Sequence, residues 1–262
     1  HERIDATAAS GRGKRKFCTT FCENCALHIL KKLKRKIACK LRGEHEEMNY
    51  RTDLAVELDE MLTAARRGSG TPEAGAPVHN ITGYLKKQSQ IDEDISVIDI
   101  EITDEEGERA FGKPRGRYVT LEVQGVIEQR NGIKERAAAA LADELAKFVK
   151  HDYYLKALVV GLGNEKVTPD SLGPHTADKV KITSHLFEIF ECDGDWDYSN
   201  VCGFNPSVTG ITGLETAELI DKVVSLARPD VVLAIDALAA KDIKRLSTTI
   251  QICDTGIMPG AG

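Results

Sequence analysis

Short stretches of alternating apolar and polar residues mark the first half of the chain. Residues 97–102 and 118–123 alternate with a period of two, which is typical of strands with one buried face, so both predict antiparallel strands. Residues 54–62 and 133–149 place their apolar side chains at helical spacing and predict amphipathic helices. Together these elements indicate a flanking N-terminal α+β subdomain over residues 54–150.

The second half of the chain contains continuous apolar runs instead. Segments with helical spacing of apolar residues separate these runs. The predicted strands cover residues 155–160, 201–204, 230–235 and 247–252, and the predicted helices cover residues 170–190 and 213–227. Strands that alternate with helices are typical of a mostly parallel sheet with helices on both faces. We therefore expect an α/β fold whose core spans residues 151–262.

Composition and charge indicate which kinds of binding partner the chain can have. The chain has 42% hydrophobic and 29% charged residues and contains no run of eighteen apolar residues, so we expect no membrane span. The formal net charge is −6, and residues 1–47 hold twelve Lys or Arg and six Asp or Glu, which leaves −12 for residues 48–262. An acidic body repels phosphate backbones, so we expect no direct nucleic-acid partner and favour a protein or small-molecule substrate.

The basic head over residues 1–47 differs in character from the rest of the chain. It begins without Met and ends just before Met48, the first methionine, so we interpret it as non-native sequence translated from upstream, with a basic amphipathic anchor as the functional alternative. The seven cysteines are odd in number and scattered, which does not build a disulfide framework in a chain of this size. This pattern favours the reducing cytoplasm.

Two acidic residues follow predicted strands, where parallel sheets gather their catalytic groups. Thr168 and Pro169 can open a helix, which would place Asp170 in a first turn where backbone N–H groups favour the ionised form. Asp236 follows five apolar residues, and partial burial would favour its protonated form. Such a pair could activate water and donate a proton in peptide hydrolysis, but a helix-opening acid and a strand-end cap would give the same pattern.

Three further motifs have structural explanations beside functional ones. Asp254 opens a D-T-G triplet like those of pepsin-like proteases, which here predicts a turn or, as the alternative, a further site residue. His185 lies on a predicted helix and could be a base, a metal ligand or a structural residue. Thr212 and Glu215 match a capping box at the start of the helix predicted over residues 213–227.

Eight motifs, taken together, resemble the germination protease family. They are R-T-D-L-A-V-E (51–57), G-R-Y-V-T-L-E (116–122), V-V-G-L-G-N (159–164), V-T-P-D (167–170), H-L-F (185–187), G-I-T-G-x-E-T (210–216), I-D-A-L-A-A (235–240) and T-I-Q-I (249–252). They occur in the family's order and at its spacing. The resemblance covers the chain from about residue 48 to its end.

The resemblance implies an endopeptidase, made as a self-processing zymogen, that initiates degradation of small acid-soluble spore proteins during germination. Asp170 and Asp236 match the family's two proposed catalytic aspartates. The processing cut would fall between Asp53 and Leu54, which makes residues 48–53 a propeptide remnant. The family resemblance also implies a homotetramer in the cytoplasm of the forespore and the spore core.

The same resemblance leaves the mechanism open. The implied fold is similar to that of hydrogenase-maturation peptidases, in which matching acids bind a metal. A metallopeptidase that uses Asp170 and Asp236 as ligands of a divalent metal is therefore the alternative to an aspartate pair for which no cofactor is expected. The family continues beyond Gly262, so we expect a core that is incomplete at its C-terminal end, and an inactive α/β binding fragment is the remaining alternative.

Overall fold

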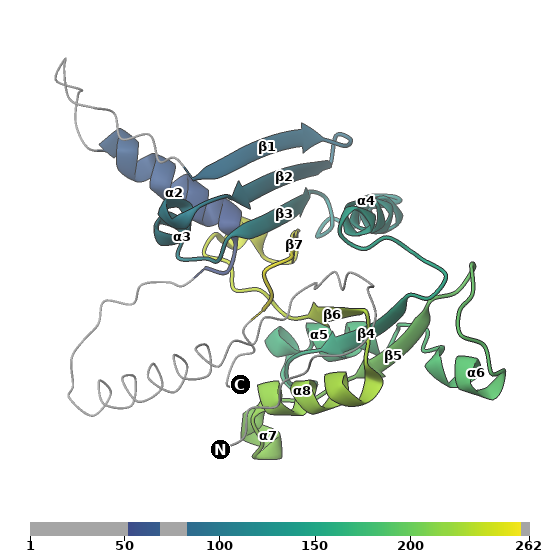
Figure 1. Cartoon of the computed structure of the whole chain (residues 1–262). Coiled ribbons are helices and arrows are strands. Elements are labelled where there is room, and N and C mark those ends of the chain that lie inside the picture. Colours follow the sequence, from purple (N-terminus) through teal and green to yellow (C-terminus); the bar gives the residue numbers. More distant parts are fainter. Residues whose placement is uncertain (1–51, 69–82, 258–262) are drawn as a thin grey trace.

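The computed structural model describes residues 52–68 and 83–257 (Figure 1). The predicted head over residues 1–47 and residues 48–51 of the predicted propeptide lie outside the described residues. The helices are α2 (Ala55–Gly68), α3 (Glu105–Phe111), α4 (Ile133–Phe148), α5 (Leu172–Ala177), α6 (Ser184–Ile189), α7 (Thr209–Thr212) and α8 (Thr216–Ala227), with 3-10 turns η1 (Thr168–Asp170) and η2 (Ile243–Arg245). The strands are β1 (Tyr84–Gln90), β2 (Ile95–Ile102), β3 (Gly116–Val123), β4 (Lys156–Gly161), β5 (Asn200–Phe204), β6 (Val231–Ile235) and β7 (Thr249–Cys253).

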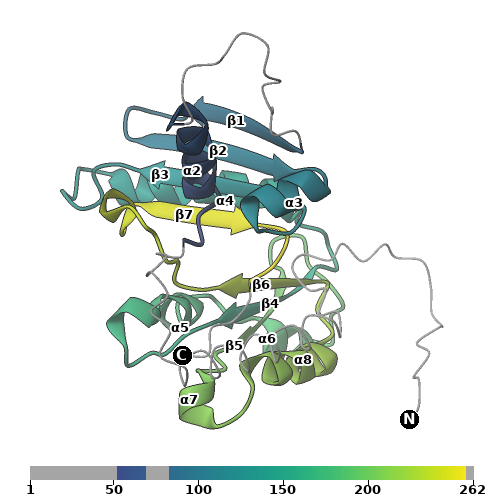
Figure 2. The ribbon, with the colours of Figure 1, turned by 90° about the vertical axis from the view of Figure 1, so that its left-hand side faces the viewer.

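An antiparallel sheet with the strand order β1-β2-β3-β7 forms one half of the molecule. The two strands predicted from alternation are confirmed as β2 and β3, which pair with Ile98 opposite Thr120. Helices α2 and α3 cover the face that carries Ile100, and α4 covers the face that carries Leu121 (Figure 2). Both faces of the central strands β2 and β3 are therefore covered, because α2 and α3 pack against one face and α4 against the other.

A smaller parallel sheet has the order β5-β4-β6. Leu158 and Val160 of β4 pack with Ile220 of α8 on one face. Gly161 alternates to the other face, where a Cβ atom would lie 2.5 Å from the Gly173 carbonyl oxygen of α5. Helices α5 and α8 thus lie on opposite faces, and the fold as a whole is mixed α/β.

The strand predicted over residues 247–252 is present as β7, but it does not join the parallel sheet. It pairs with β3, so that Gln251 lies opposite Thr120. Ile252 packs in the core under α4 and Cys253 in the core under α2, so both faces of β7 meet covered apolar surface. The expectation that these residues belong to the parallel core is therefore corrected, because β7 is an edge strand of the antiparallel sheet.

The helix predicted over residues 170–190 is divided into η1, α5 and α6. The division occurs because Thr183 binds the start of β5 instead of continuing a helix. Its N–H donates to the Val201 carbonyl at 3.0 Å and its hydroxyl donates to the Ser199 carbonyl at 2.6 Å. Tertiary hydrogen bonds thus outweigh the local helical pattern.

The second predicted helix begins later than expected, and its predicted capping box is wrong. Gly213, with a φ of +70°, ends the short helix α7, so α8 begins only at Thr216. The Thr212 hydroxyl accepts from the Leu214 N–H at 3.2 Å, and Glu215 is the residue before α8 without a side-chain cap. The glycine stops one helix rather than opening the next.

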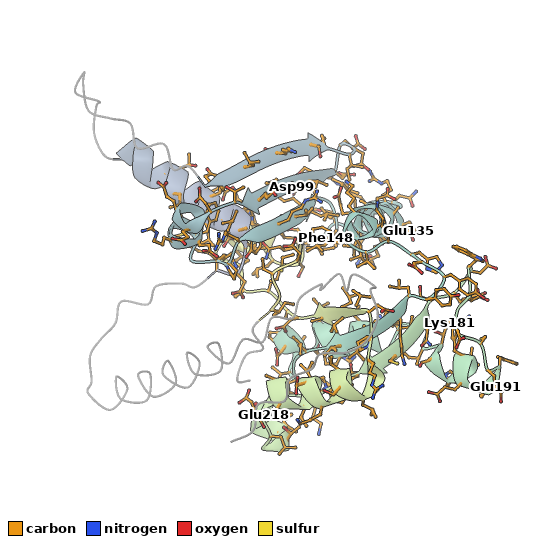
Figure 3. All side chains as sticks on the ribbon, in the orientation of Figure 1. Asp99, Glu135, Phe148, Lys181, Glu191 and Glu218 are labelled. Carbon is orange, nitrogen blue, oxygen red and sulfur yellow. The ribbon has the colours of Figure 1, made fainter. Side chains whose placement is uncertain are left out.

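Charged side chains are exposed beside α6 and on α8, as Glu191 and Glu218 illustrate (Figure 3). Between α4 and the antiparallel sheet, the guanidinium of Arg117 lies 5.1 Å from the centre of the Phe148 ring and pairs with Asp99 at 2.7 Å. Within the described ranges, no helix combines the length and the apolar character needed to cross a bilayer.

Candidate active site

Asp170 lies in the turn η1 beside the C-terminal end of β4. Its Oδ2 atom accepts a hydrogen bond from the Asn164 N–H at 2.7 Å. Gly163 permits this approach, because its φ of +114° favours glycine and an added Cβ would overlap the Asp170 carbonyl oxygen. The predicted side-chain cap from Thr168 is wrong, so the carboxyl group is bound by a loop amide rather than by the N-terminus of a long helix.

Asp236 directly follows β6 at the same end of the parallel sheet. The Ile235 carbonyl accepts from the Leu162 N–H at 2.8 Å, which extends the pairing of β4 and β6 up to the site. The Asp236 Oδ1 atom accepts from the adjacent Ala237 N–H at 2.8 Å. Burial raises the pKa of Asp236 in spite of that hydrogen bond, and the direction predicted from the apolar run is confirmed.

Two acidic residues act electrostatically on Asp236 at this end of the sheet. After burial, the negative charges of Asp170 and Asp53 are what raise the pKa of Asp236. Asp170 and Asp236 come from segments that follow neighbouring parallel strands, whereas Asp53 comes from the segment before α2. The structure thus brings together the two predicted catalytic residues and the residue before the predicted cut.

The predicted processing peptide passes between the loop that follows β6 and strand β7. Asp53 donates its N–H to the Ala239 carbonyl at 2.9 Å, and the Ala239 N–H donates to the Asp53 Oδ2 atom at 3.1 Å. Gln251 donates from Nε2 to the Asp53 carbonyl oxygen at 3.1 Å and accepts at Oε1 from the Ala55 N–H at 2.8 Å. Leu54 is only 1% exposed in the core under α2, so both sides of the Asp53–Leu54 bond are anchored.

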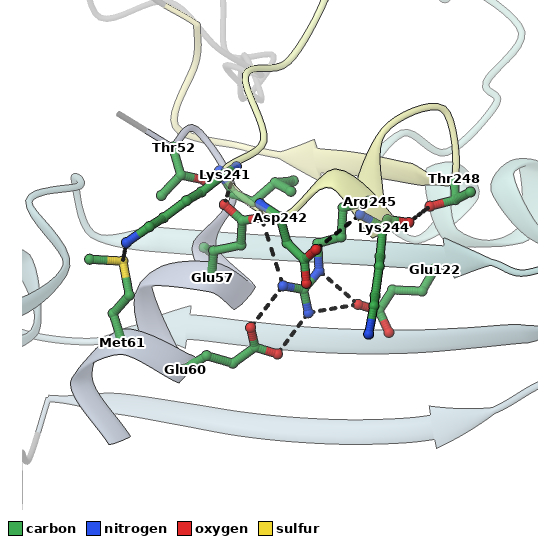
Figure 4. A network of polar contacts seen from close by, with 12 residues as sticks. Thr52, Glu57, Glu60, Met61, Glu122, Lys241, Asp242, Lys244, Arg245 and Thr248 are labelled. Atoms are coloured by element: carbon green, nitrogen blue, oxygen red, sulfur yellow. Dashed lines mark hydrogen bonds and ion pairs between the residues drawn. The ribbon is translucent and has the colours of Figure 1, made fainter. Parts of the chain in front are cut away.

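The loop after β6 is tied to α2 through the buried carboxylate of Glu57 (Figure 4). Glu57 accepts backbone hydrogen bonds from Lys241 at 2.8 Å and Asp242 at 2.9 Å. Burial opposes its ionisation, but hydrogen bonds from the Thr52 side chain and these two amides, with the charge of Arg245, lower the pKa of Glu57 overall. An ionised Glu57 therefore holds the loop that contacts Asp53.

Arg245 completes this connection between the loop, α2 and β3. Its guanidinium makes two hydrogen bonds of 2.7 Å to Glu60 and bonds of 3.0 and 3.1 Å to Glu122 (Figure 4). The Arg245 side chain is 12% exposed and lies 3.8 Å from Glu57. The pair with Glu60 is bidentate, which gives it a defined geometry, although the Glu60 side chain is 53% exposed. Arg245 thus links the loop after β6 to α2 and β3.

The two other candidate residues do not join this group. The Asp254 Oδ1 atom accepts from the Arg117 N–H at 2.8 Å, where the bend after β7 meets the start of β3. His185 is exposed on α6, which lies beside the start of β5 rather than at its carboxyl end. Neither contributes to the charges that raise the pKa of Asp236.

Gln251 and Ala239 are the contacts that the sequence analysis missed. Gln251 is visible in the sequence only as a polar residue within the apolar strand T-I-Q-I, and it lies 198 residues from Asp53. Ala239 binds through its backbone, which no residue type reveals. Apolar periodicity carries no information on either pairing.

The side chains at the site supply only part of a metal-binding set. Catalytic zinc sites use three protein ligands. Asp170 and Asp236 offer two carboxyl groups, and within residues 52–68 and 83–257 no three His, Cys, Asp or Glu side chains are grouped to hold a metal ion. Within the described residues, the two carboxyl groups therefore lack the third side-chain ligand that such a site would use.

Comparison with known proteins shows similarity to germination proteases along most of the chain. The germination protease family profile matches residues 55–262. The chain is 41% identical over 215 residues to the germination protease of Clostridium tetani, with 82% of this chain and 63% of that protein aligned. It is 40% identical over 215 residues to the germination protease of Bacillus subtilis, with 81% of this chain and 56% of that protein aligned.

The alignments cover most of this chain but a smaller share of each relative. A third relative, the germination protease of Caldanaerobacter subterraneus, is 41% identical over 218 residues, which cover 82% of this chain and 62% of that protein. The chain thus spans between 56% and 63% of the length of these relatives. Because the family profile covers most of the residues and includes both strand-end aspartates, the chain belongs to the germination protease family.

Proposed function

We propose that this chain forms the core of an endopeptidase that is made as a zymogen and cleaves itself between Asp53 and Leu54. The proposed catalytic pair is Asp170 and Asp236. The observation that carries the proposal is that Asp53 is hydrogen-bonded to Ala239, in the loop that Asp236 begins, at the edge of the parallel sheet where Asp170 also lies. A processing site that neighbours its own catalytic residues fits a reaction within one chain.

In the proposed mechanism, Asp170 takes a proton from a water molecule whose oxygen attacks the carbonyl carbon of Asp53. Asp236, which burial favours in the protonated form, donates its proton to the carbonyl oxygen. When the tetrahedral intermediate collapses, the C–N bond breaks, Asp170 gives its proton to the Leu54 nitrogen, and Asp236 regains a proton from a hydroxyl of the intermediate. The products are a carboxyl group on Asp53 and an amine on Leu54, with both aspartates restored.

Family membership supports the rest of the proposal. The proposed substrates in trans are small acid-soluble spore proteins, cleaved in the cytoplasm of the spore core during germination. The proposed assembly is a homotetramer. The proposed fold type is that of hydrogenase-maturation peptidases, which is supported by a parallel sheet with helices α5 and α8 on its two faces.

The test compares Asp170→Asn and Asp236→Asn in a protein of full family length that carries these residues. Each change should slow cleavage after Asp53 by roughly 10²–10⁴-fold, because it removes one partner of a proton-transfer pair. The mass of the released N-terminal segment identifies the cut and its rate. Asp143→Asn on the exposed face of α4 is the matched control and should process normally.

Three additional measurements separate the alternatives. A rate constant that is independent of protein concentration supports cleavage within one chain, whereas a rate that rises with concentration indicates cleavage between chains. Loss of activity with a chelator, restored by a divalent metal, would favour the metallopeptidase. Normal processing in both aspartate variants would refute the pair, and no cleavage of a small acid-soluble spore protein at any pH would favour a non-catalytic binding role.

A further inference from the structure

The carbonyl group of the proposed processing bond is held by a side chain from the far end of the sequence. Gln251 of β7 donates from Nε2 to the Asp53 carbonyl oxygen at 3.1 Å and accepts at Oε1 from the Ala55 N–H at 2.8 Å. The Leu54 N–H, on the other side of the same bond, donates to the Thr52 hydroxyl at 3.1 Å. Every polar backbone group around this bond therefore has a defined partner.

Capping of helix α2 explains only one of the two hydrogen bonds that Gln251 makes. Ala55 is the first residue of α2, so the Gln251 Oε1 atom satisfies one of the amides that a helix N-terminus leaves free. That contact needs an acceptor alone. The donor contact to the Asp53 carbonyl lies outside the helix and on the one carbonyl oxygen that gains negative charge if the Asp53–Leu54 bond is hydrolysed.

We infer that Gln251 positions the Asp53 carbonyl for attack and stabilises the partial negative charge that develops on its oxygen before the proton from Asp236 arrives. The inference rests on the proposed function, because it assumes cleavage at this bond. A fixed N–H donor aimed at a developing oxyanion acts where it is most effective, since it needs no reorganisation during the reaction. Gln251 lies on β7, whose partner β3 is covered on both faces, so the donor is held by the more densely packed half of the molecule.

Two variants separate the donor from the helix cap. Gln251→Glu keeps an acceptor for the Ala55 N–H, which suits a helix N-terminus, but has no N–H to donate to Asp53. Gln251→Leu removes both contacts without adding a charge. We expect each variant to slow the release of the N-terminal segment by about 10²-fold or more in the full-length protein. Gln88→Leu, on the exposed strand β1, is the matched control and should process at the parent rate.

The readouts are the rate and the position of the cut by mass spectrometry, with thermal unfolding measured alongside. Slow cleavage in both Gln251 variants, with Gln251→Glu unfolding near the parent temperature and some cuts displaced from Asp53, supports the inference. Normal cleavage in Gln251→Glu assigns this residue to helix capping alone and overturns it. If Asp236→Asn blocks processing while both Gln251 variants cut normally, only the inference about Gln251 fails. If Asp236→Asn processes normally, or the parent protein does not cleave itself, the proposed function fails as well.

Discussion

The antiparallel sheet and the parallel sheet differ in how many fully buried side chains they contain. Ten of the twelve largest fully buried side chains lie in or against the antiparallel sheet, and the other two, Leu158 and Val160, belong to β4. The parallel sheet instead ends in closely approached glycines and in Asp236, whose pKa is raised by burial and by the negative charges of Asp170 and Asp53. Fully buried apolar side chains are thus concentrated in one sheet, whereas Asp170, Asp236 and the strained Gly163 lie at the edge of the other.

The largest expected effect is a difference in packing between the sheets. Ile100→Ala removes a fully buried side chain from the antiparallel sheet and should lower the free energy of unfolding by about 3–5 kcal/mol. Leu233→Ala in the half-buried part of β6 should cost about 1–2 kcal/mol. Urea denaturation measures both. Equal losses would show that the two sheets contribute alike.

A smaller effect is expected for the backbone that shapes the parallel sheet's carboxyl edge. Gly163→Ala should lower the free energy of unfolding by more than about 2 kcal/mol, because it adds a clash with Asp170 to the strain of a positive φ. Gly213→Ala is the matched control, since its φ is also positive but no atom lies within 4 Å of the added Cβ. It should cost only about 1 kcal/mol. Indistinguishable losses would remove the argument for a close Gly163 contact.

The connection between the two sheets can be weakened at Arg245. Arg245→Met leaves Glu57 and Glu122 with fewer partners and should destabilise the protein by about 2–3 kcal/mol, less than a fully buried pair would. Lys222→Met removes an exposed ion pair with Asp221 and should change the free energy of unfolding by about 0.5 kcal/mol at most. Thermal and urea unfolding provide the comparison. A loss no larger than that of Lys222→Met would mean that the Arg245 network contributes nothing to cohesion.

The smallest expected effect has the opposite sign. The pKa of Asp236 is raised in the folded protein above its ordinary value of 3.8, so the folded state binds this proton more tightly than the unfolded chain. The resulting stabilisation is complete below the ordinary pKa and is lost as the pH rises through the folded pKa. Asp236→Asn should therefore unfold slightly less readily than the parent at neutral pH, with the advantage shrinking in acid. An advantage that grew as the pH fell would contradict the raised pKa.

Periodicity predicted the elements whose burial follows a regular pattern. Strands β2, β3, β4 and β6 and helix α4 were all expected, because apolar spacing reports which face is covered. Strand β1 was missed, since six of its seven residues are exposed and Lys86, Lys87 and Gln88 form no apolar pattern. The partner of β7 could not be predicted either, because two covered faces give the same apolar run in a parallel or an antiparallel sheet.

The site was accessible to sequence reasoning only in part. Asp170 and Asp236 could be located because strand ends in a parallel sheet gather functional groups, although their catalytic role is still a prediction. The contact of Gln251 with Asp53 could not be located, since it depends on how β7 returns to β3. Local patterns describe the surroundings of one segment, whereas this contact joins segments at opposite ends of the described chain.

The return of β7 to β3 sets an order for folding during synthesis. Arg117 at the start of β3 and Asp254 after β7 are 137 residues apart, so the ribosome completes the parallel sheet's strands before it makes the last strand of the antiparallel one. At a translation rate of about 5–20 residues per second, the nascent β3 edge waits on the order of ten seconds for its neighbour. An open edge attracts other strands, so chaperones that shield nascent chains should matter most during this interval.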